Sequence, residues 1–280
     1  MAKKAAVNKI ILHTVLIIVS FICVFPVYVM ISCSFKPLSE IYASSIAFPV
    51  RPTMDNYVRL FNYNSGIIIR TFFNSLYVAS ATTVLTLIIA SMAGFAFSKF
   101  NFKGKNLLFF ILLMTMMLPK ELLITPQFLI FSKIGWLNTY KVQIIPFIAN
   151  VFAMFMFRQY MMSIPDSLLE AAYIDGAGHF KVFAKIVVPT AAPAFGALGI
   201  LQFLSMWNDY LYPRIMIDKM SLKPIMVVLP TLSENDSSSA ALPYDLMMAG
   251  CSIVIIPMII VFFCLQDKFL SSVTIGSVKE

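Results

Sequence analysis

The chain has 280 residues, of which 60% are hydrophobic and 12% charged, and its formal net charge is +8. In soluble domains roughly a quarter of all residues are charged, so this composition excludes a soluble globule. The 26 Phe, 18 Met and 11 Tyr also exclude a disordered chain, because they carry more apolar surface than a chain that cannot fold. We therefore predict an all-α integral membrane protein with a single domain over residues 1–280.

Long uncharged stretches predict where the chain crosses a bilayer. Four of them contain 26, 28, 23 and 21 residues, and a spanning helix needs about 20. Two shorter stretches of 14 and 16 residues can span only if the flanking charges lie at the interface or extend to the headgroups. We expect six transmembrane helices, over about residues 10–32, 75–97, 106–125, 142–160, 190–208 and 246–266.

The first predicted helix has a second interpretation, because Lys3, Lys4 and Lys9 followed by an apolar run also begin a secretory signal peptide. The uncharged run of 26 residues is longer than the apolar region of a signal peptide, and no small-residue cleavage site follows it. A retained helix is favoured. The four cysteines lie within or at the ends of predicted spans, so they are interpreted as apolar packing residues.

The basic residues indicate the orientation. Six helices would place both termini on one side, where 11 of the 21 Lys and Arg residues would lie. The totals are nearly even, but the N-terminal tail and the turn from Lys99 to Lys105 carry six basic residues and no acidic one. Short basic segments of this kind favour the cytoplasm. Anionic membrane lipids are then a sufficient partner for the net charge, and we expect no nucleic-acid binding.

The sequence lacks the residues of an enzyme or a metal site. No two of its ten glycines are five positions apart, so a Walker-type phosphate loop cannot occur. His13 and His179 have no partner at ligand spacing on a helix face. The four long spans contain no Asp, Glu, Lys or Arg, which disfavours a proton-coupled carrier. We expect no catalytic residue, no metal and no cofactor bound by this chain.

The predicted cytoplasmic loop, about residues 161–189, carries the strongest local signal. A short amphipathic helix is expected there, with Ser163 as its N-cap or with Ser167 and Glu170 as a capping box. Gly176 and Gly178 are expected to end it, in left-handed or tightly packed backbone. The helix could lie on lipid headgroups, but adjacent alanines and paired glycines suit close contact with another protein.

The same loop resembles a known signature. Glu170-Ala171-Ala172, three residues, Gly176, nine residues, Ile186, one residue, Val188 and Pro189 are similar to the EAA motif of permease subunits in binding-protein-dependent ABC importers. The pattern of that motif is E-A-A-x3-G-x9-I-x-L-P, and only Val188 departs from it.

Other segments resemble the carbohydrate-uptake branch of this family, the maltose and glycerol-phosphate type, and its second, six-helix permease. These segments are Phe48-Pro49, Asn56-Tyr57, Leu60-Phe61, Phe73-Asn74-Ser75-Leu76, Trp207-Asn208-Asp209-Tyr210-Leu211-Tyr212-Pro213 and Gly276-Ser277-Val278-Lys279-Glu280. The resemblance covers about residues 10–280.

The resemblance implies a type I ABC importer permease fold with a cytoplasmic coupling helix, in the cytoplasmic membrane of a bacterium or archaeon. It also implies partners: a second permease, two cytoplasmic ATPase subunits that use ATP and Mg, and an extracytoplasmic sugar-binding protein. Residues 163–175 would form the coupling helix, with Glu170 in a charged contact to an ATPase subunit and Gly176 as the turn. Further positions at the ATPase interface would be Ala171, Ala172, Ile186, Pro189, and the tail with Gly276 and Lys279.

Candidates for the translocation pathway lie inside the predicted membrane region. Trp207, Asn208, Asp209 and Tyr210 could contact a sugar, or could belong to an interfacial aromatic belt. Asn150 could line the pathway or bond a neighbouring helix. Two other functions remain open: a permease for a non-sugar solute, and a membrane scaffold for an ATPase that moves no solute.

Overall fold

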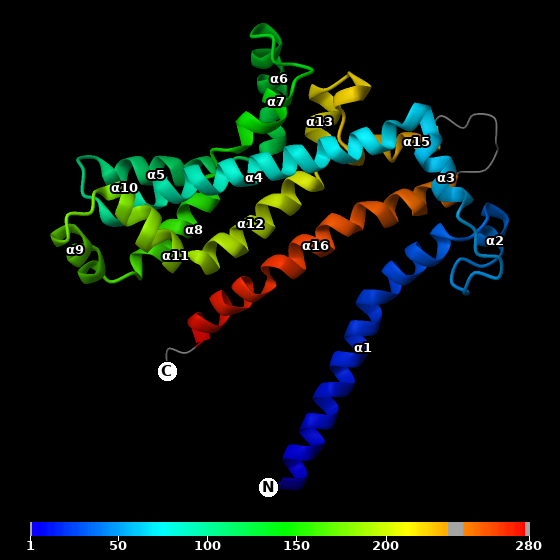
Figure 1. The fold of residues 1–280 in the computed structure, drawn as a ribbon, viewed down its shortest axis with the longest axis horizontal. Coiled ribbons are helices and arrows are strands. Elements are labelled where there is room, and N and C mark those ends of the chain that lie inside the picture. The colour runs from blue at the N-terminus through cyan, green and yellow to red at the C-terminus, as the bar shows by residue number, and fades with distance from the viewer. Residues whose placement is uncertain (1, 235–242, 278–280) are drawn as a thin grey trace. The chain divides into compact units, whose positions relative to one another are not determined.

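The computed structural model describes residues 2–234 and 243–277, with side chains described for residues 9–232 and 243–266 (Figure 1). All regular structure in this part of the chain is helical. The residues form two compact units, Met1–Ile69 with Val228–Ile256, and Arg70–Val227 with Pro257–Glu280. Each unit is described by itself.

The first unit begins with the long helix α1 and includes the N-terminal part of α16. Its helices are α1 (Ala2–Ser34), α2 (Leu38–Ala43), α3 (Asp55–Asn62), the 3-10 turn η1 (Tyr63–Gly66), α15 (Thr231–Glu234) and α16 (Tyr244–Ser277). The helices expected over residues 10–32 and 246–266 are confirmed, and both extend beyond the predicted bounds.

A buried lysine organises the segment after α1. The Lys36 side chain is 0% exposed, and its ammonium donates to the backbone oxygens of Ser44 (3.0 Å), Ser45 (3.2 Å) and Ala47. A buried charge is tolerated only when its hydrogen bonds are satisfied, and these carbonyl oxygens satisfy them. The backbone of residues 44–47 is thereby anchored to the end of α1, while its side chains remain exposed.

The second unit contains most of the remaining helices. They are α4 (Ile67–Lys99), α5 (Lys105–Thr115), η2 (Lys120–Leu123), α6 (Ile124–Lys133), α7 (Tyr140–Ile144), η3 (Ile145–Phe147), α8 (Val151–Met162), α9 (Asp166–Ile174), α10 (His179–Val182), the π-helical η4 (Phe183–Val187), α11 (Val188–Thr190), α12 (Ala192–Trp207), α13 (Leu211–Met216), η5 (Met220–Leu222) and α14 (Ile225–Val228).

The single helix expected over residues 106–125 is wrong, because the chain breaks between α5 and η2. The segments Lys105–Thr115 and Lys120–Lys133 meet at 89°. Pro119, which precedes η2, has φ −58° and ψ 127°. α5 ends at Thr115, and Pro119, which lacks an N–H and disfavours helical backbone in the residue before it, prevents one continuous helix through this segment.

The helix expected over residues 142–160 is also interrupted. Pro146 lies in η3, and Asn150 leaves the helical region at ψ 104° before α8 begins. The helix expected over 190–208 is confirmed as α12, but it follows a bend of 78° after Thr190. The helix expected over 75–97 is confirmed within α4.

By length and composition, the described residues contain between four and six candidate membrane spans. Four helical segments are long and apolar enough to cross a bilayer: Lys9–Ser34, Asp55–Lys99, Tyr140–Met162 and Tyr244–Gln266. The two bent pairs raise the number to six if each pair crosses once. The predicted six helices are the upper limit of this range.

The core of the second unit forms where α4, α8 and α12 pack. At Gly94 a Cβ atom would lie 2.7 Å from Phe157 Cβ and 2.9 Å from the Arg158 backbone nitrogen, so α4 and α8 touch backbone to backbone. Phe157 is fully buried and its ring lies 4.6 Å from that of Phe195 on α12. The same apolar cluster continues to Leu169 of α9.

Candidate functional site

A short helix, α9, lies where the coupling helix is expected, and only one side of it is covered by the chain. Leu169 is 4% exposed, and Ala172 packs against the core cluster of the second unit. Glu170 and Ala171 are exposed, and Ile174 is 86% exposed. Glu170 and Ala171 thus face outward, whereas Ala172 contributes to packing within the chain.

The helix start differs from both predicted capping schemes. Pro165 occupies the N-cap position and makes no side-chain cap. Ser163 instead ends α8, where its hydroxyl donates to the Tyr160 backbone oxygen at 2.7 Å. Ser167 lies inside the first turn of α9, two positions after the N-cap, so it cannot cap the helix.

A lysine from another helix holds the start of α9. Lys99, the last residue of α4, donates from its ammonium to the Ile164 backbone oxygen and to Asp166 Oδ1, both at 2.6 Å. The Lys99 side chain is only 8% exposed, whereas that of Asp166 is 75% exposed. Lys99 therefore holds the start of α9 through acceptor groups, whereas the predicted serine cap, which would accept a backbone N–H of the first turn, is absent.

Gly176 ends α9 in left-handed backbone with φ +79°, as the sequence predicts. The Gly176 N–H donates to the Tyr173 oxygen and the Ala177 N–H to the Ala172 oxygen, both at 3.0 Å. This pair of bonds is a Schellman motif, which satisfies the last carbonyls of a helix. Gly178 differs, since its φ of −72° is open to any residue.

The segment after α9 connects it to α12. His179 Nδ1 lies 3.0 Å from the Tyr173 hydroxyl, and the histidine ring packs edge-on against Phe100 and Tyr173. Ile186 packs against the core cluster, and Pro189 is exposed in α11. Side-chain and backbone contacts thus hold both ends of α9 in the second unit.

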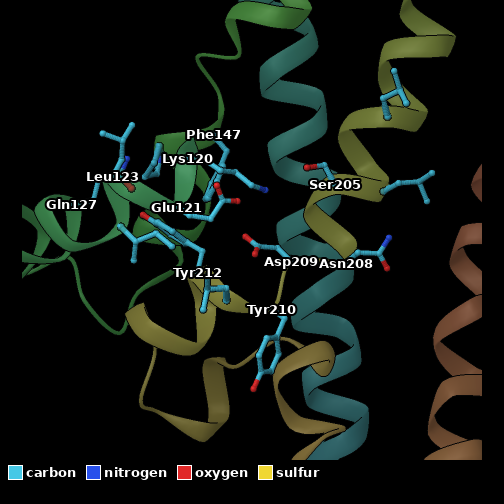
Figure 2. A pocket seen from close by; sticks show the side chains of 15 residues that line it. Lys120, Glu121, Leu123, Gln127, Phe147, Ser205, Asn208, Asp209, Tyr210 and Tyr212 are labelled. Carbon is cyan, nitrogen blue, oxygen red and sulfur yellow. The ribbon is translucent and has the colours of Figure 1, made fainter. Parts of the chain in front are cut away.

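A cavity of about 730 Å³ lies beside the end of α12 (Figure 2). Polar side chains from the α5–α6 break and from the segment after α12 line it, together with apolar residues. The polar members used below are Lys120, Glu121, Ser205, Asn208, Asp209 and Tyr212. In Figure 2 the Asp209 carboxylate extends toward Glu121 and Tyr212, and the Tyr210 ring extends away from this group.

Two groups in the cavity have shifted acidities. Burial raises the pKa of the Asp209 carboxyl, and the positive charge of Lys120 partly opposes this shift. Burial and the nearby Asp209 charge raise the pKa of the Tyr212 phenol, which therefore remains protonated. The Tyr212 hydroxyl is buried and has no hydrogen-bond partner among the described residues.

The structure separates Trp207 from the other predicted pathway residues. Asn208, Asp209 and Tyr210 line the cavity. Trp207 is 0% exposed, stacks on Phe203 at 5.7 Å and meets Phe72 edge-on at 5.6 Å. Its ring faces neither the cavity nor the molecular surface, so stacking on a sugar and an interfacial belt both disagree with its position here.

Asn150 both bonds a neighbouring helix and borders a smaller cavity of about 220 Å³. Its amide nitrogen donates to Gln202 Oε1 on α12 at 2.8 Å, and its amide oxygen accepts the Ala153 N–H at 3.0 Å as the N-cap of α8. The bond to a neighbouring helix is confirmed, and a place of Asn150 on the translocation pathway stays a prediction.

Lys120, Glu121 and Tyr212 line the cavity, although the sequence did not predict them as site residues. The signal was present, because charged residues in an otherwise apolar run are functional candidates by default. Lys120 and Glu121 were instead interpreted as lying at an interface. The break at Pro119, which turns them into the cavity, was not predicted.

Asn74 lies in one of the segments that resemble the family, and its hydrogen bonds connect three elements. Its amide nitrogen donates to the backbone oxygens of Ser221 (3.0 Å) and Lys223 (3.1 Å), and its oxygen accepts the Tyr140 hydroxyl at 2.7 Å. Asn74 thereby anchors the segment after α13 to α4 and α7.

Helices that can span a membrane, a half-covered helix between two of them and a polar cavity are features of a membrane permease. The family described as "binding-protein-dependent transport system inner membrane component" matches residues 83–275. The chain belongs to this family, and it is a permease subunit of a binding-protein-dependent ABC importer.

Curated relatives match over nearly the whole chain. The arabinooligosaccharides transport system permease protein AraQ of Bacillus subtilis is 35% identical, over 98% of this chain and 97% of its own. The lactose transport system permease protein LacG of Rhizobium radiobacter is 30% identical, over 96% of each chain. The sn-glycerol-3-phosphate transport system permease protein UgpE of Brucella abortus is also 30% identical, over 96% and 97%.

A solved structure has the same fold. A chain of a bacterial ABC transporter involved in the import of the acidic polysaccharide alginate aligns with a TM-score of 0.83 and 24% identity, over 94% of this chain and 97% of that chain. The likeness confirms the predicted all-α permease fold.

Proposed function

We propose that this chain is the membrane-spanning subunit of an ATP-driven sugar importer. It forms half of the translocation pathway with a second permease. Two cytoplasmic ATPase subunits, which hold the ATP and Mg, dock on the coupling helix, and an extracytoplasmic sugar-binding protein delivers the solute. Both termini lie in the cytoplasm, on the same side as α9, in a bacterial or archaeal cytoplasmic membrane.

The sugar assignment is supported by relatives and by the cavity. Relatives that match over nearly the whole chain are named for arabinooligosaccharides and for lactose. The cavity combines an apolar wall with the polar groups of Asn208, Asp209 and Tyr212. A few placed polar groups on a mainly apolar wall are what recognition of a hydroxylated ligand needs.

The uncovered side of α9 carries the coupling proposal. Glu170 and Ala171 are exposed, as is the apolar side chain of Ile174, while Lys99 holds one end of the helix and Gly176 the other. A helix fixed at both ends moves as a rigid body when a partner displaces it. Through α8 and α12, which flank the loop, this displacement would switch the cavity between the two sides of the membrane.

We also propose that the C-terminal tail lies at the ATPase interface. Gly276 lies in the last turn of α16, where side chains are not described, and Lys279 lies outside the described residues.

The test is reconstitution of this chain with its second permease, ATPase and binding protein in liposomes. We expect one sugar from a panel to stimulate ATP hydrolysis through the loaded binding protein and to enter the liposomes. Glu170→Ala should reduce both, because removing one partner of a buried charged contact costs about 2–5 kcal/mol. Asp218→Ala, at another exposed acidic residue of the second unit, is the matched control.

Two outcomes would contradict the proposal. A non-sugar solute that alone stimulates hydrolysis would assign the chain to another solute class. A stable complex whose hydrolysis ignores every solute would indicate a scaffold for an ATPase.

A further inference from the structure

A separate cavity of about 350 Å³ lies where α5 begins and passes α8. Its lining includes Lys105 and Arg158 and the amide side chains of Asn101 and Asn106, and none of its seven lining residues is acidic. Gly104 precedes α5 with φ +82°, in left-handed backbone. Two fixed positive charges therefore face the same small space without a neutralising carboxylate in its wall.

Both cations are held in place by their own contacts. The Lys105 ammonium donates to the Phe100 backbone oxygen at 2.7 Å, and Arg158 Nε donates to the Phe97 oxygen at 3.2 Å. The Arg158 guanidinium also lies 4.2 Å over the ring of Phe109. The Nε bond uses one of five guanidinium N–H donors, and the planar fork of the others suits a phosphate group.

The cavity adjoins an apolar helix face. Along α5, Leu107 is 66% exposed, Phe110 61%, Ile111 50% and Met114 52%. α5 is also the first half of a candidate membrane span. A basic cavity at the end of a lipid-facing helix is the arrangement that recognises anionic headgroups.

We infer that this cavity binds the phosphate headgroup of an anionic phospholipid, with the acyl chains along the exposed face of α5. Zwitterionic lipids fit less well, because their own cation would face Lys105 and Arg158. The apolar face beside the cavity favours a lipid over a free anion.

The experiment uses the full chain in its purified transporter complex and counts retained phosphatidylglycerol by native mass spectrometry after titration. The main variant is Asn106→Asp, because it adds a negative charge at an exposed residue without changing side-chain size. Lys105→Gln removes a positive charge, and Arg158→Lys keeps one while removing the planar fork. Asn62→Asp, exposed on α3 of the first unit, is the matched control.

We expect Asn106→Asp and Lys105→Gln each to weaken retention of one phosphatidylglycerol about fivefold, since each basic residue near an anionic surface contributes about that factor. Arg158→Lys should weaken it less than Lys105→Gln, and Asn62→Asp should retain the wild-type amount. Retention that is equal in Asn106→Asp, Lys105→Gln and Asn62→Asp would overturn the inference. Displacement of the lipid by millimolar inorganic phosphate would also overturn it, by indicating a site for a soluble anion.

Discussion

The Lys99 ammonium lies 2.6 Å from Asp166 Oδ1, which joins the last residue of α4 to the first residue of α9. The same ammonium holds the Ile164 backbone oxygen, also at 2.6 Å. The start of the exposed helix is thus attached to a long helix that runs far from it in sequence. Displacement of α9 must therefore act on α4 as well as on the flanking helices.

Substitution of Lys99 should reduce the stability of the protein more than substitution of Asp166. Lys99→Met leaves a backbone oxygen and a carboxylate without their donor, so we expect a loss of about 1.5–3 kcal/mol. Asp166→Asn removes only the exposed end of the ion pair and should cost at most about 1 kcal/mol. Melting temperatures of the purified complex measure both. Equal shifts would show that the ion pair, rather than the Ile164 bond, carries the contact.

Gly176 and Gly178 should respond oppositely to the same substitution. Gly176→Ala forces a Cβ into left-handed backbone, at a cost of about 1–2 kcal/mol, and should also reduce coupled transport. Gly178→Ala should be tolerated, because its φ is −72° and nothing lies within 4 Å of an added Cβ. Melting temperature and uptake are compared for the pair. Impaired uptake by Gly178→Ala at unchanged stability would instead indicate a partner surface at that glycine.

The crossing of α4 and α8 should not accept a methyl group. Gly94→Ala places a Cβ against backbone atoms of α8, and overpacking of this kind costs about 1–3 kcal/mol. Gly199→Ala is the matched control, because the nearest atom to its added Cβ is Leu87 Cδ1 at 3.5 Å. Its gain in helix propensity should raise stability by up to about 1 kcal/mol. A melting temperature of Gly94→Ala at or above the wild type would contradict the close approach.

Asn150 and Gln202 should be energetically coupled. The single changes Asn150→Ala and Gln202→Ala each break the bond between α8 and α12, so a double-mutant cycle should return about 0.5–1.5 kcal/mol of coupling. Asn150→Ala should be the costlier single change, because it also removes the N-cap of α8, worth about 1 kcal/mol. Additive effects in the unfolding free energy would show that the two side chains act separately.

The sequence was sufficient for the helical class and for most helix positions, because long uncharged runs have few other solutions in lipid. It failed at Pro119 and near Pro146, in the two uncharged stretches that are shorter than a spanning helix needs and that contain a residue without an N–H. The positions of charged residues indicate how long an apolar stretch is, but they do not indicate where a helix bends. The capping of α9 failed for a different reason, since Pro165 and not a serine occupies the N-cap position. The contact of Lys99 with Asp166 was missed because the two residues are 67 positions apart and no local pattern encodes it.

The candidate sites were predictable to different extents. The position of Gly176 followed from spacing and from the φ that only glycine adopts easily. The cavity did not follow, because it combines Asp209 after α12 with Lys120 and Glu121, which the break before η2 brings to the same place. Trp207 was selected by its residue type, and only the packing of Phe72 and Phe203 shows that it is buried.

The reactivity of the buried Lys36 amine can be used to measure local opening of the first unit. An amine-acylating reagent reaches its nitrogen only when the carbonyl cage of residues 44–47 opens, whereas the exposed Lys133 of α6 reacts without any opening. The ratio of the two labelling rates therefore measures the free energy of that local opening, in the way that amide exchange does for a backbone. The mass added to Lys36 thus reports the opening of the loop after α1, without any mutation.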